Sequence, residues 1–431
     1  MLVRGRDRSE GLAMTKRSVA LAFLAALLVL GCAAPIAGAA GSPTQPAPTV
    51  IVAVLDGCPA GSLEYLPDTA FLNRVKLSDD CLVSTVRTVF PSSTAAGHAA
   101  IFTGTYPEEN GITGKEYLLD DGSLSGFGSP DLFERPTLFH LAKSAGIDTA
   151  MTSAKKNVLV RLSGAVDVPI HAGDYPQWIA EIAGSPPDDS EQYADYAGWH
   201  IRHDAWIIDA TCAYLERHQE PAVIGINLGS PDKCGHRFGP APAEETLASL
   251  ASTSEGLERL ATTLEKTRPG NWCLIITADH GMTSVDTPVV ISDIVDSAAE
   301  VTGVEVNVTL DGGAAFIWSD DATCGIIADA LRIHPGVQEV IVSSDEERRA
   351  DLHIQHPRVP PLIGIAKEGH MFIQSEFLMA ATLGSHGTCL DSDVLVPLIV
   401  YGPRLPSTSV EEMGSVTHIF ALVEELLGVR R

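Results

Sequence analysis

Three strongly apolar stretches of this chain each lead, directly or within a few residues, to an aspartate. The stretches are Thr49–Leu55, Ala222–Leu228 and Trp272–Thr277, and the aspartates are Asp56, Asp232 and Asp279. Runs rich in Val, Ile and Leu are typical of strands buried on both faces of a parallel sheet. Segments of helical length separate them, and functional groups gather beyond the carboxyl ends of such strands. The sequence therefore predicts an α/β domain with a mostly parallel central sheet and acidic side chains at one edge.

The alternation of strand and helix breaks between residues 284 and 383. Short strands are expected there at Glu305–Leu310, Ala314–Trp318 and Val337–Val342, with a helix at Thr323–Arg332. We interpret this segment as an α+β insertion, or cap, over the site. Residues 49–283 and 384–431 would then form the catalytic domain.

The N-terminus predicts export. Basic residues up to Arg17 precede the apolar run Val19–Leu30, which is too short to span a bilayer comfortably. A lipoprotein-type site would leave a lipid on Cys32, whereas Ala37-Gly38-Ala39 would release the protein, and an uncleaved anchor is a third alternative. Residues 1–40 are thus a signal peptide or lipoprotein signal and 41–48 a linker. We expect an extracellular, periplasmic or membrane-anchored cell-surface protein.

The charge of the chain argues against dedicated nucleic-acid binding. It carries 29 basic and 55 acidic residues, for a formal net charge of −26. A phosphate backbone is repelled by a protein without a basic face. We expect a small anionic substrate, and the sequence does not indicate an oligomeric state.

Histidines and a threonine accompany the aspartates. Asp232 and His236 lie four residues apart, Asp279 and His280 are adjacent, and His386 stands in a Gly-rich turn. Oxygen and imidazole ligands suit a catalytic Zn²⁺ or Mn²⁺ ion, and two such ions could hold the attacking and leaving oxygens of a phosphoryl displacement.

Thr94 lies in a turn that is expected to enter a helix. An ordinary N-cap is the simplest interpretation of a lone threonine at this place. Beside two ions, however, Thr94 Oγ would be a nucleophile and would give a covalent phosphothreonine. Three cysteines lie near the expected ligands, but their spacing fits no thiolate site, which favours a packing role for Cys58, Cys234 and Cys389.

Together these stretches resemble the alkaline phosphatase superfamily, on the branch of type I phosphodiesterases/nucleotide pyrophosphatases and phosphonoacetate hydrolase. The resemblance runs from about Thr49 to about Pro403 and is weakest over residues 284–383. It implies an alkaline-phosphatase-like three-layer sandwich and a nucleophilic Thr94. It also implies one ion held by Asp56, Thr94, Asp279 and His280, and a second held by Asp232, His236 and His386.

Two positions depart from the family pattern. Lys115 stands where family members place an asparagine that binds a phosphate oxygen. Lys155 matches the first cation of a K-x-K or K-x-R loop after a predicted strand, and Asn157 replaces the second. A lysine makes a charge-assisted bond to a phosphate dianion. Lys115, Lys155 and Asn157 are therefore expected to bind substrate, with a preference for a terminal phosphate or phosphonate over a diester.

Several functions fit these residues. The leading prediction is a metal-dependent phosphoric ester hydrolase that acts on phosphodiester, pyrophosphate or phosphomonoester bonds. C–P hydrolysis, as in phosphonoacetate hydrolase, is the alternative within the same chemistry. A sulfatase is disfavoured, because no C-x-[PA]-x-R stretch is present. A non-catalytic metal- or phosphate-binding protein on the same scaffold is the alternative of a different class.

Overall fold

The structure is a computed structural model that describes residues 46–374 and 382–429. The predicted export signal, Cys32 and most of the predicted linker lie outside the described residues. Within those two ranges, no helix has both the length and the apolar character needed to cross a membrane.

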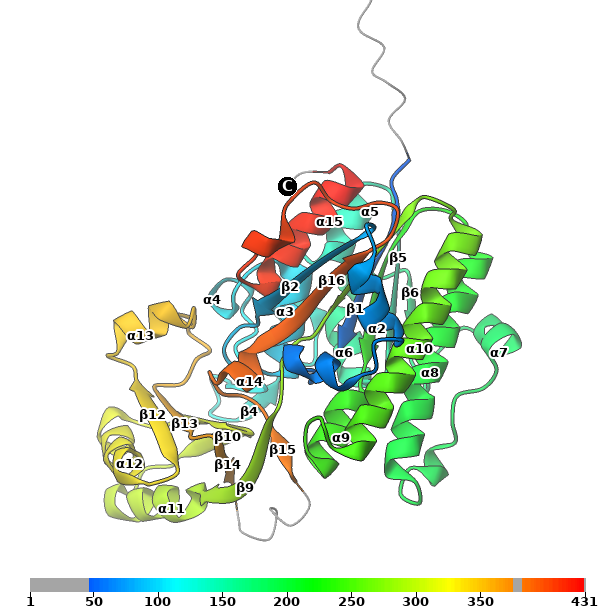
Figure 1. Cartoon of the computed structure of the whole chain (residues 1–431). Helices are drawn as coiled ribbons and strands as arrows, with labels where there is room; N and C mark the ends of the chain where they lie inside the picture. Colours follow the sequence, from blue (N-terminus) through cyan, green and yellow to red (C-terminus); the bar gives the residue numbers. More distant parts are fainter. Residues whose placement is uncertain (1–45, 375–381, 430–431) are drawn as a thin grey trace, which may run out of the picture. The chain divides into compact units, whose positions relative to one another are not determined.

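A seven-stranded sheet forms the centre of the fold (Figure 1). β1 (Thr49–Leu55) lies in its middle, between β7 (Ala222–Leu228) and β8 (Trp272–Thr277), and pairs in parallel with both. All residues of these three strands are buried, as their apolar sequences predict. The full strand order is β2-β16-β8-β1-β7-β5-β6, in which β16 runs antiparallel to its neighbours. The outer strands are β2 (Cys81–Arg87), β5 (Asp148–Ser153), β6 (Val168–Ile170) and β16 (Leu395–Tyr401). The predicted mostly parallel sheet is confirmed.

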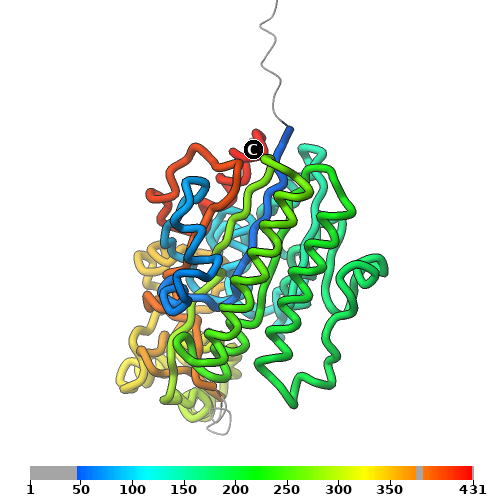
Figure 2. Tube along the Cα trace, turned by 45° about the vertical axis from the view of Figure 1, so that its right-hand side comes forward, coloured from blue at the N-terminus to red at the C-terminus, as the bar shows by residue number. Residues whose placement is uncertain are grey.

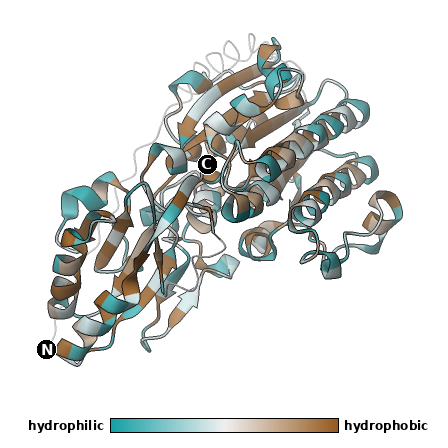
Figure 3. Cartoon of the chain, turned by 60° about the horizontal axis from the view of Figure 1, so that its bottom comes forward, coloured by the Kyte–Doolittle hydropathy of each residue, from teal (hydrophilic) through white to brown (hydrophobic). Residues whose placement is uncertain are grey.

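Helices cover both faces of this sheet. The long helices α8 (Tyr196–Arg217) and α10 (Glu244–Thr267) pack against each other on one face, and Figure 2 shows them side by side in green. The opposite face carries α3 (Thr94–Thr103), α5 (Leu138–Ser144) and α15 (Ile419–Leu427). Figure 3 shows the apolar strands in brown and the two-sided character of the long helices.

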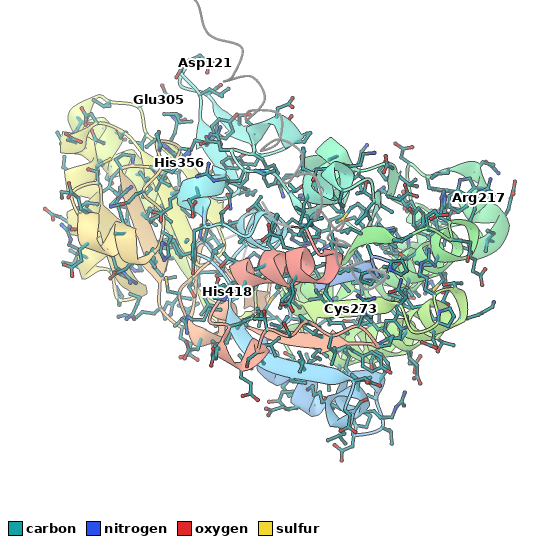
Figure 4. The ribbon with its side chains drawn as sticks, turned by 90° about the horizontal axis from the view of Figure 1, so that it is seen from above. Asp121, Arg217, Cys273, Glu305, His356 and His418 are labelled. Atoms are coloured by element: carbon teal, nitrogen blue, oxygen red, sulfur yellow. The ribbon has the colours of Figure 1, made fainter. Side chains whose placement is uncertain are left out.

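The layers enclose one large apolar core. Cys273 of β8 is fully buried within it, whereas Arg217, at the end of α8, lies at the surface (Figure 4). Shorter elements complete this part of the chain. They are the helices α2 (Phe71–Arg74), α4 (Pro107–Asn110), α6 (Lys156–Leu162), α7 (Gln177–Ala183), α9 (Ser230–Phe238) and α14 (Asp391–Val394), and the strands β3 (Glu116–Leu118) and β4 (Leu124–Gly126).

One local expectation was wrong. The residues from Ser153 to Asn157 were expected to form a loop, but α6 begins at Lys156, so Asn157 lies on a helix. The helix forms because apolar side chains that follow Asn157, including Val158 and Leu162, are buried in the main core.

In residues 283–374 and 382–385, the described part of this segment, the chain forms two small sheets and three helices. The antiparallel sheet β10-β11-β13-β12 packs against α11 and α12 around a separate apolar core, and β9 joins β14 and β15 in the second sheet. The strands are β9 (Thr283–Val290), β10 (Asn307–Asp311), β11 (Ala314–Trp318), β12 (Val337–Val342), β13 (Leu362–Ala366), β14 (Gly369–Ile373) and β15 (Gly384–Ser385), and the helices are α11 (Ile291–Thr302), α12 (Asp321–Ile333) and α13 (Glu346–Asp351). β15 leads directly into His386, so this part of the chain ends at the site.

Candidate active site

The three aspartates lie together at one edge of the central sheet. Asp56 follows β1, Asp279 follows β8 after one residue, and Asp232 lies in the first turn of α9, which follows β7. Each is at most 1% exposed. Gly57 has a φ of 68°, and a Cβ there would lie 3.0 Å from the Cα of Asp232. A glycine is therefore required for the chain to turn away after β1 while α9 approaches closely.

Thr94 is the first residue of α3, and its hydroxyl points at this cluster. Its Oγ1 lies 3.4 Å from Oδ1 of Asp56 and 3.3 Å from Nε2 of His280. α3 approaches the end of β8 so closely that a Cβ on Gly97 would lie 2.1 Å from the backbone oxygen of Asp279. The glycine one turn after Thr94 thus allows the hydroxyl to reach the carboxylates.

Three histidines converge on the carboxylates with the same arrangement. Each has its Nδ1 close to a backbone carbonyl oxygen: His236 to Gly384 at 2.8 Å, His280 to Gly281 at 2.8 Å, and His386 to Ser92 at 3.0 Å. A carbonyl accepts only, so Nδ1 carries a proton and Nε2 faces the carboxylates, where it can hold a second proton or bind a cation. Histidines held in this way are oriented as metal ligands.

The Nε2 atoms point at carboxylate oxygens that lack hydrogen bonds. Asp232 Oδ1 is buried without a hydrogen-bond partner, although Nε2 of His236 and of His386 lie 3.1 and 3.8 Å from it. Asp279 Oδ2 is likewise buried and accepts no well-aligned hydrogen bond, although Nε2 of His280 lies 3.5 Å and Nδ1 of His98 lies 3.0 Å from it.

Buried lone pairs that face each other are unfavourable unless a proton or a cation lies between them. Ligand atoms of Asp232, His236 and His386 lie within 4.8 Å of one another, and so do those of Asp56, Asp232 and His280. These donors fit two divalent cations.

A lysine also reaches the cluster. Nζ of Lys155 lies 2.6 Å from Oδ1 of Asp56, 2.7 Å from Oδ2 of Asp232 and 3.3 Å from Oγ1 of Thr94. Lys155 immediately precedes α6, and that junction turns its side chain inward. The ammonium group balances the negative charges of the Asp56 and Asp232 carboxylates and also lies beside the Thr94 hydroxyl.

The pKa values in the cluster reflect burial and these charges. Burial would raise the pKa of Asp56, but Lys155 and His280 together outweigh it and hold the pKa below its ordinary value. Burial acts in the same way on Asp232, and Lys155 together with His236 leaves its pKa well below the ordinary value. For His280, burial lowers the pKa, yet Asp279 and Asp56 together raise it to about 10. Asp56 and Asp232 therefore stay ionised at neutral pH, as metal-ligating carboxylates must be.

Two residues that the sequence did not identify hold the aspartates in place. Nδ2 of Asn227, in β7, donates to Oδ2 of Asp56 at 2.8 Å and lies 3.2 Å from Nε2 of His98. Nδ1 of His98 lies 2.9 Å from the backbone oxygen of Thr94 and 3.0 Å from Oδ2 of Asp279. His98 lies four residues after Thr94 on α3, and this spacing was the sequence signal that could have indicated its role. Asn227 lies inside a strand and gave no signal.

Asp204 of α8 holds the beginning of α9, the helix that carries two of the candidate metal ligands. Its two carboxylate oxygens accept hydrogen bonds from the backbone N–H groups of Gly229 and Ser230, at 2.9 and 2.7 Å. These residues begin α9, the helix that carries Asp232 and His236. The sequence alone indicated only that α8 packs on the sheet.

The cluster opens into a cavity of about 660 Å³. Lys115 and Asn157 line this cavity together with Thr94 and Lys155, so the structure brings every predicted site residue to one place. Lys115 is exposed, whereas the segment 283–385 contributes Asp311, Met371 and Ser385 to the wall.

The cysteines near the cluster are not arranged as ligands. Cys58, Cys234 and Cys389 belong to no group of potential metal ligands among the described residues. Burial raises the pKa of the thiols of Cys58 and Cys234 to about 12 and that of Cys389 to about 11. Protonated, buried thiols fit the packing role expected for them.

The family model for type I phosphodiesterase / nucleotide pyrophosphatase matches residues 50–388. The chain belongs to this family. The family uses two metal ions, and the Asp/His cluster of this member fits such a site.

Curated relatives of this family member are distant. It is 23% identical to the bovine (Bos taurus) bis(5'-adenosyl)-triphosphatase ENPP4 over 410 residues, which cover 94% of this chain and 83% of the relative. It is 25% identical to the ectonucleotide pyrophosphatase/phosphodiesterase C27A7.3 of Caenorhabditis elegans, covering 85% of this chain and 48% of that protein.

Solved structures confirm the alkaline-phosphatase-like fold. The alkaline phosphatase PafA matches with a TM-score of 0.71 at 16% identity, covering 89% of this chain and 96% of that one. Phosphonoacetate hydrolase from Sinorhizobium meliloti, in complex with phosphonoacetate, matches at 0.67 and 20%, covering 88% and 96%. Murine ectonucleotide pyrophosphatase / phosphodiesterase 5, inactive through a Thr-to-Ala change and in complex with AMP, matches at 0.67 and 20%, covering 89% and 96%.

Proposed function

We propose that the protein is an exported two-metal phosphohydrolase that cleaves phosphoester or pyrophosphate bonds through a phosphothreonine at Thr94. The observation that carries this proposal is the convergence of three histidine Nε2 atoms on buried carboxylate oxygens without hydrogen-bond partners, with a hydroxyl beside them. Family membership supports the reaction class.

The ligands divide into two sets. Asp56, Thr94, Asp279 and His280 would hold one ion, and Asp232, His236 and His386 the other. Oxygen and imidazole donors without thiolates suit Zn²⁺ or Mn²⁺. When bound, two such ions would lower the pKa of the Thr94 hydroxyl and supply positive charge to the phosphoryl oxygens.

The chain's own residues would carry the rest of the reaction. Thr94 Oγ attacks phosphorus, the bond to the leaving oxygen breaks, and a water molecule later cleaves the phosphothreonine. Lys155 lies 3.3 Å from the hydroxyl, where its charge can balance a phosphoryl oxygen. The first N–H groups of α3 also favour an anion beside Thr94.

Thr94 as the nucleophile has support from a structural relative. The inactive form of murine ectonucleotide pyrophosphatase / phosphodiesterase 5 has a threonine replaced by alanine. We infer that Thr94 fulfils the equivalent role, because it is the hydroxyl that lies against the metal-ligand cluster.

The decisive experiment is hydrolysis by the purified protein with Zn²⁺ or Mn²⁺. The substrates are p-nitrophenyl phosphate, bis-p-nitrophenyl phosphate, a p-nitrophenyl nucleotide ester and phosphonoacetate, each also tested with Thr94→Ala. Turnover that requires metal and is lost in Thr94→Ala supports the proposal. Bound metal without turnover of any substrate would instead favour a binding protein.

C–P hydrolysis is the second candidate. Lys115 and Lys155 are among the residues that line the cavity with Thr94, and a cation favours a phosphonate dianion. The solved phosphonoacetate hydrolase shares the fold. Release of acetate and phosphate from phosphonoacetate, faster than hydrolysis of any ester, would select this alternative.

Support for export comes from the basic and apolar pattern of residues 1–40 and from the relatives, which include an ectonucleotide pyrophosphatase/phosphodiesterase and a venom phosphodiesterase. Mass spectrometry of the mature N-terminus distinguishes the alternatives. Lipid on Cys32 indicates a lipoprotein, a start near Ala39 a released protein, and an intact N-terminus an anchor or no export.

A further inference from the structure

One buried cation on the wall of the active-site cavity has no role in the chemistry described above. Arg161 of α6 is 5% exposed, and its Nε donates to the backbone oxygen of Phe127 at 2.6 Å. Its Nη1 is also buried but has no hydrogen-bond partner within residues 46–374 and 382–429. A buried guanidinium nitrogen without a partner is costly, so its retention calls for a ligand.

Arg161 is placed to meet a ligand of the same cavity. It lines the cavity with Asn157, which lies one helical turn earlier on the same face of α6. α6 packs against α3, the helix that begins with Thr94. Lys115 lines the cavity as well and forms no ion pair with any described residue.

The nearest opposing charge does not neutralise Arg161. Asp311, at the end of β10, lines the cavity, and its charge acts on Arg161, but no ion pair joins the two side chains in the described parts of the chain. Asp311 Oδ2 is itself buried without a hydrogen-bond partner. Burial lowers the pKa of Arg161 to about 10, so it remains a cation at neutral pH. The cavity therefore contains a buried cation and a buried carboxylate that do not pair.

We propose that Arg161, with Asn157, forms a second anion subsite that binds a carboxylate or phosphate group carried by the substrate beside the reacting phosphorus. This inference rests on the proposed function and deepens it. The substrate class becomes phosphoryl or phosphonyl compounds with a second anionic group. Asp311 limits how tightly that group is bound, because its carboxylate faces the same space.

Calorimetric binding to the metal-loaded full-length protein tests the subsite without requiring turnover. The probes are methylphosphonate, which has one anionic group, phosphonoacetate, which adds a carboxylate, and methylenediphosphonate, which adds a phosphonate. All titrations are made at one free-metal concentration, so that chelation by the probes cancels between variants. The latter two probes distinguish a carboxylate from a phosphate-like group as the occupant.

The key variant is Arg161→Gln, whose amide can still donate to the Phe127 carbonyl while the charge is lost. We expect the wild type to bind at least one two-anion probe roughly tenfold or more tightly than methylphosphonate, the range of a charge-assisted hydrogen bond. In Arg161→Gln this preference should largely vanish, and in Arg161→Lys part of it should remain. Arg332→Gln, an exposed arginine on α12, is the matched control.

A second variant keeps the test decisive even if Arg161→Gln does not fold. Asp311→Asn should increase the preference for two-anion probes. The inference is overturned if Arg161→Gln weakens all three probes equally, or if neither variant changes the preference. Turnover without any two-anion preference would leave the proposed function standing and remove the subsite. A two-anion preference without turnover of any substrate would support the subsite and contradict the proposed function.

Discussion

Nζ of Lys155 lies 2.6 Å from Oδ1 of Asp56. The same ammonium group lies 2.7 Å from Oδ2 of Asp232, so it bridges two carboxylates that we assign to different metal ions. Asp56 is fully buried and Asp232 is 1% exposed. Without divalent cations, Lys155 is the lysine that compensates both charges.

Lys155→Met should therefore destabilise the metal-free protein far more than the metal-loaded one. Removing one partner of a buried ion pair costs on the order of 3–5 kcal/mol, because the remaining charge stays buried. Bound Zn²⁺ supplies the missing positive charge, and the loss should then be much smaller. Denaturant unfolding with a chelator and with excess Zn²⁺ measures both values. Lys115→Met, at an exposed lysine, is the control, and an equal loss for Lys155→Met in both conditions would refute this role.

Asn227 should control metal affinity without contacting a metal. Its Nδ2 donates to Oδ2 of Asp56 and faces Nε2 of His98, so Asn227→Leu removes the hydrogen bonds that orient both side chains. Changes to residues that orient ligands typically lower metal affinity by roughly 10- to 100-fold. Titration of Zn²⁺ against a competing chelator measures the change. Asn271→Ala, whose side chain bonds to Ala47 and Arg404 away from the cluster, should leave the affinity unaltered. Unchanged affinity in Asn227→Leu would show that Asp56 is oriented by other contacts.

Asp204 should give the stability a characteristic pH dependence. Burial raises the pKa of Asp204 from 3.8 to about 6, although hydrogen bonds from Ser230 and Gly229 oppose the shift. Because the folded pKa is above the unfolded one, the contribution to stability is full below about pH 4 and is lost as the pH rises through 6. The shift corresponds to roughly 3 kcal/mol.

Comparison with Asp204→Asn isolates this contribution, because the asparagine does not titrate. The free energy of unfolding of the wild type, relative to that of Asp204→Asn, should fall between pH 4 and 6.5. Both proteins are unfolded in denaturant with a chelator. No metal is then bound at any pH, so pH-dependent release of metal does not contribute to the measured difference. A difference that stays constant over this range would show that Asp204 titrates normally.

The sequence predicted the central sheet well, for physical reasons. β1, β7 and β8 coincide with the predicted apolar runs, because strands buried on both faces must be continuously apolar. The predicted ligands follow turns at strand ends, where polar side chains stand out from the apolar background.

The supporting residues could not be predicted in the same way. Asn227 lies within a strand, Asp204 in the middle of a long helix, and Arg161 on the short helix α6, for which no prediction was made from the sequence. Each reaches the site only because sheet order and helix packing bring distant parts of the chain together. Asp311 lies in the segment where the resemblance to the family was weakest, so no motif marked it.

Lys115 should set the preference between phosphate monoesters and diesters. It lines the cavity beside Thr94, is exposed, and forms no ion pair with any described residue, so its charge is available to a substrate. Lys115→Asn replaces a charged donor by a neutral one. A charge-assisted bond to a dianion exceeds a neutral bond by roughly 1–2 kcal/mol, so the ratio of kcat/KM for p-nitrophenyl phosphate to that for bis-p-nitrophenyl phosphate should fall about tenfold.

Two further variants separate charge from shape at this position. Lys115→Arg should keep most of the wild-type ratio, because the cation is retained, whereas Lys115→Gln should behave like Lys115→Asn. Lys143→Asn, at a surface lysine paired with Asp167, controls for a general loss of positive charge. If Lys115→Asn leaves the ratio unchanged, the monoanion and the dianion are distinguished by Lys155 and the metal ions alone. A ratio that rises would mean that Lys115 contacts the second ester group of a diester, and the expected preference would be reversed.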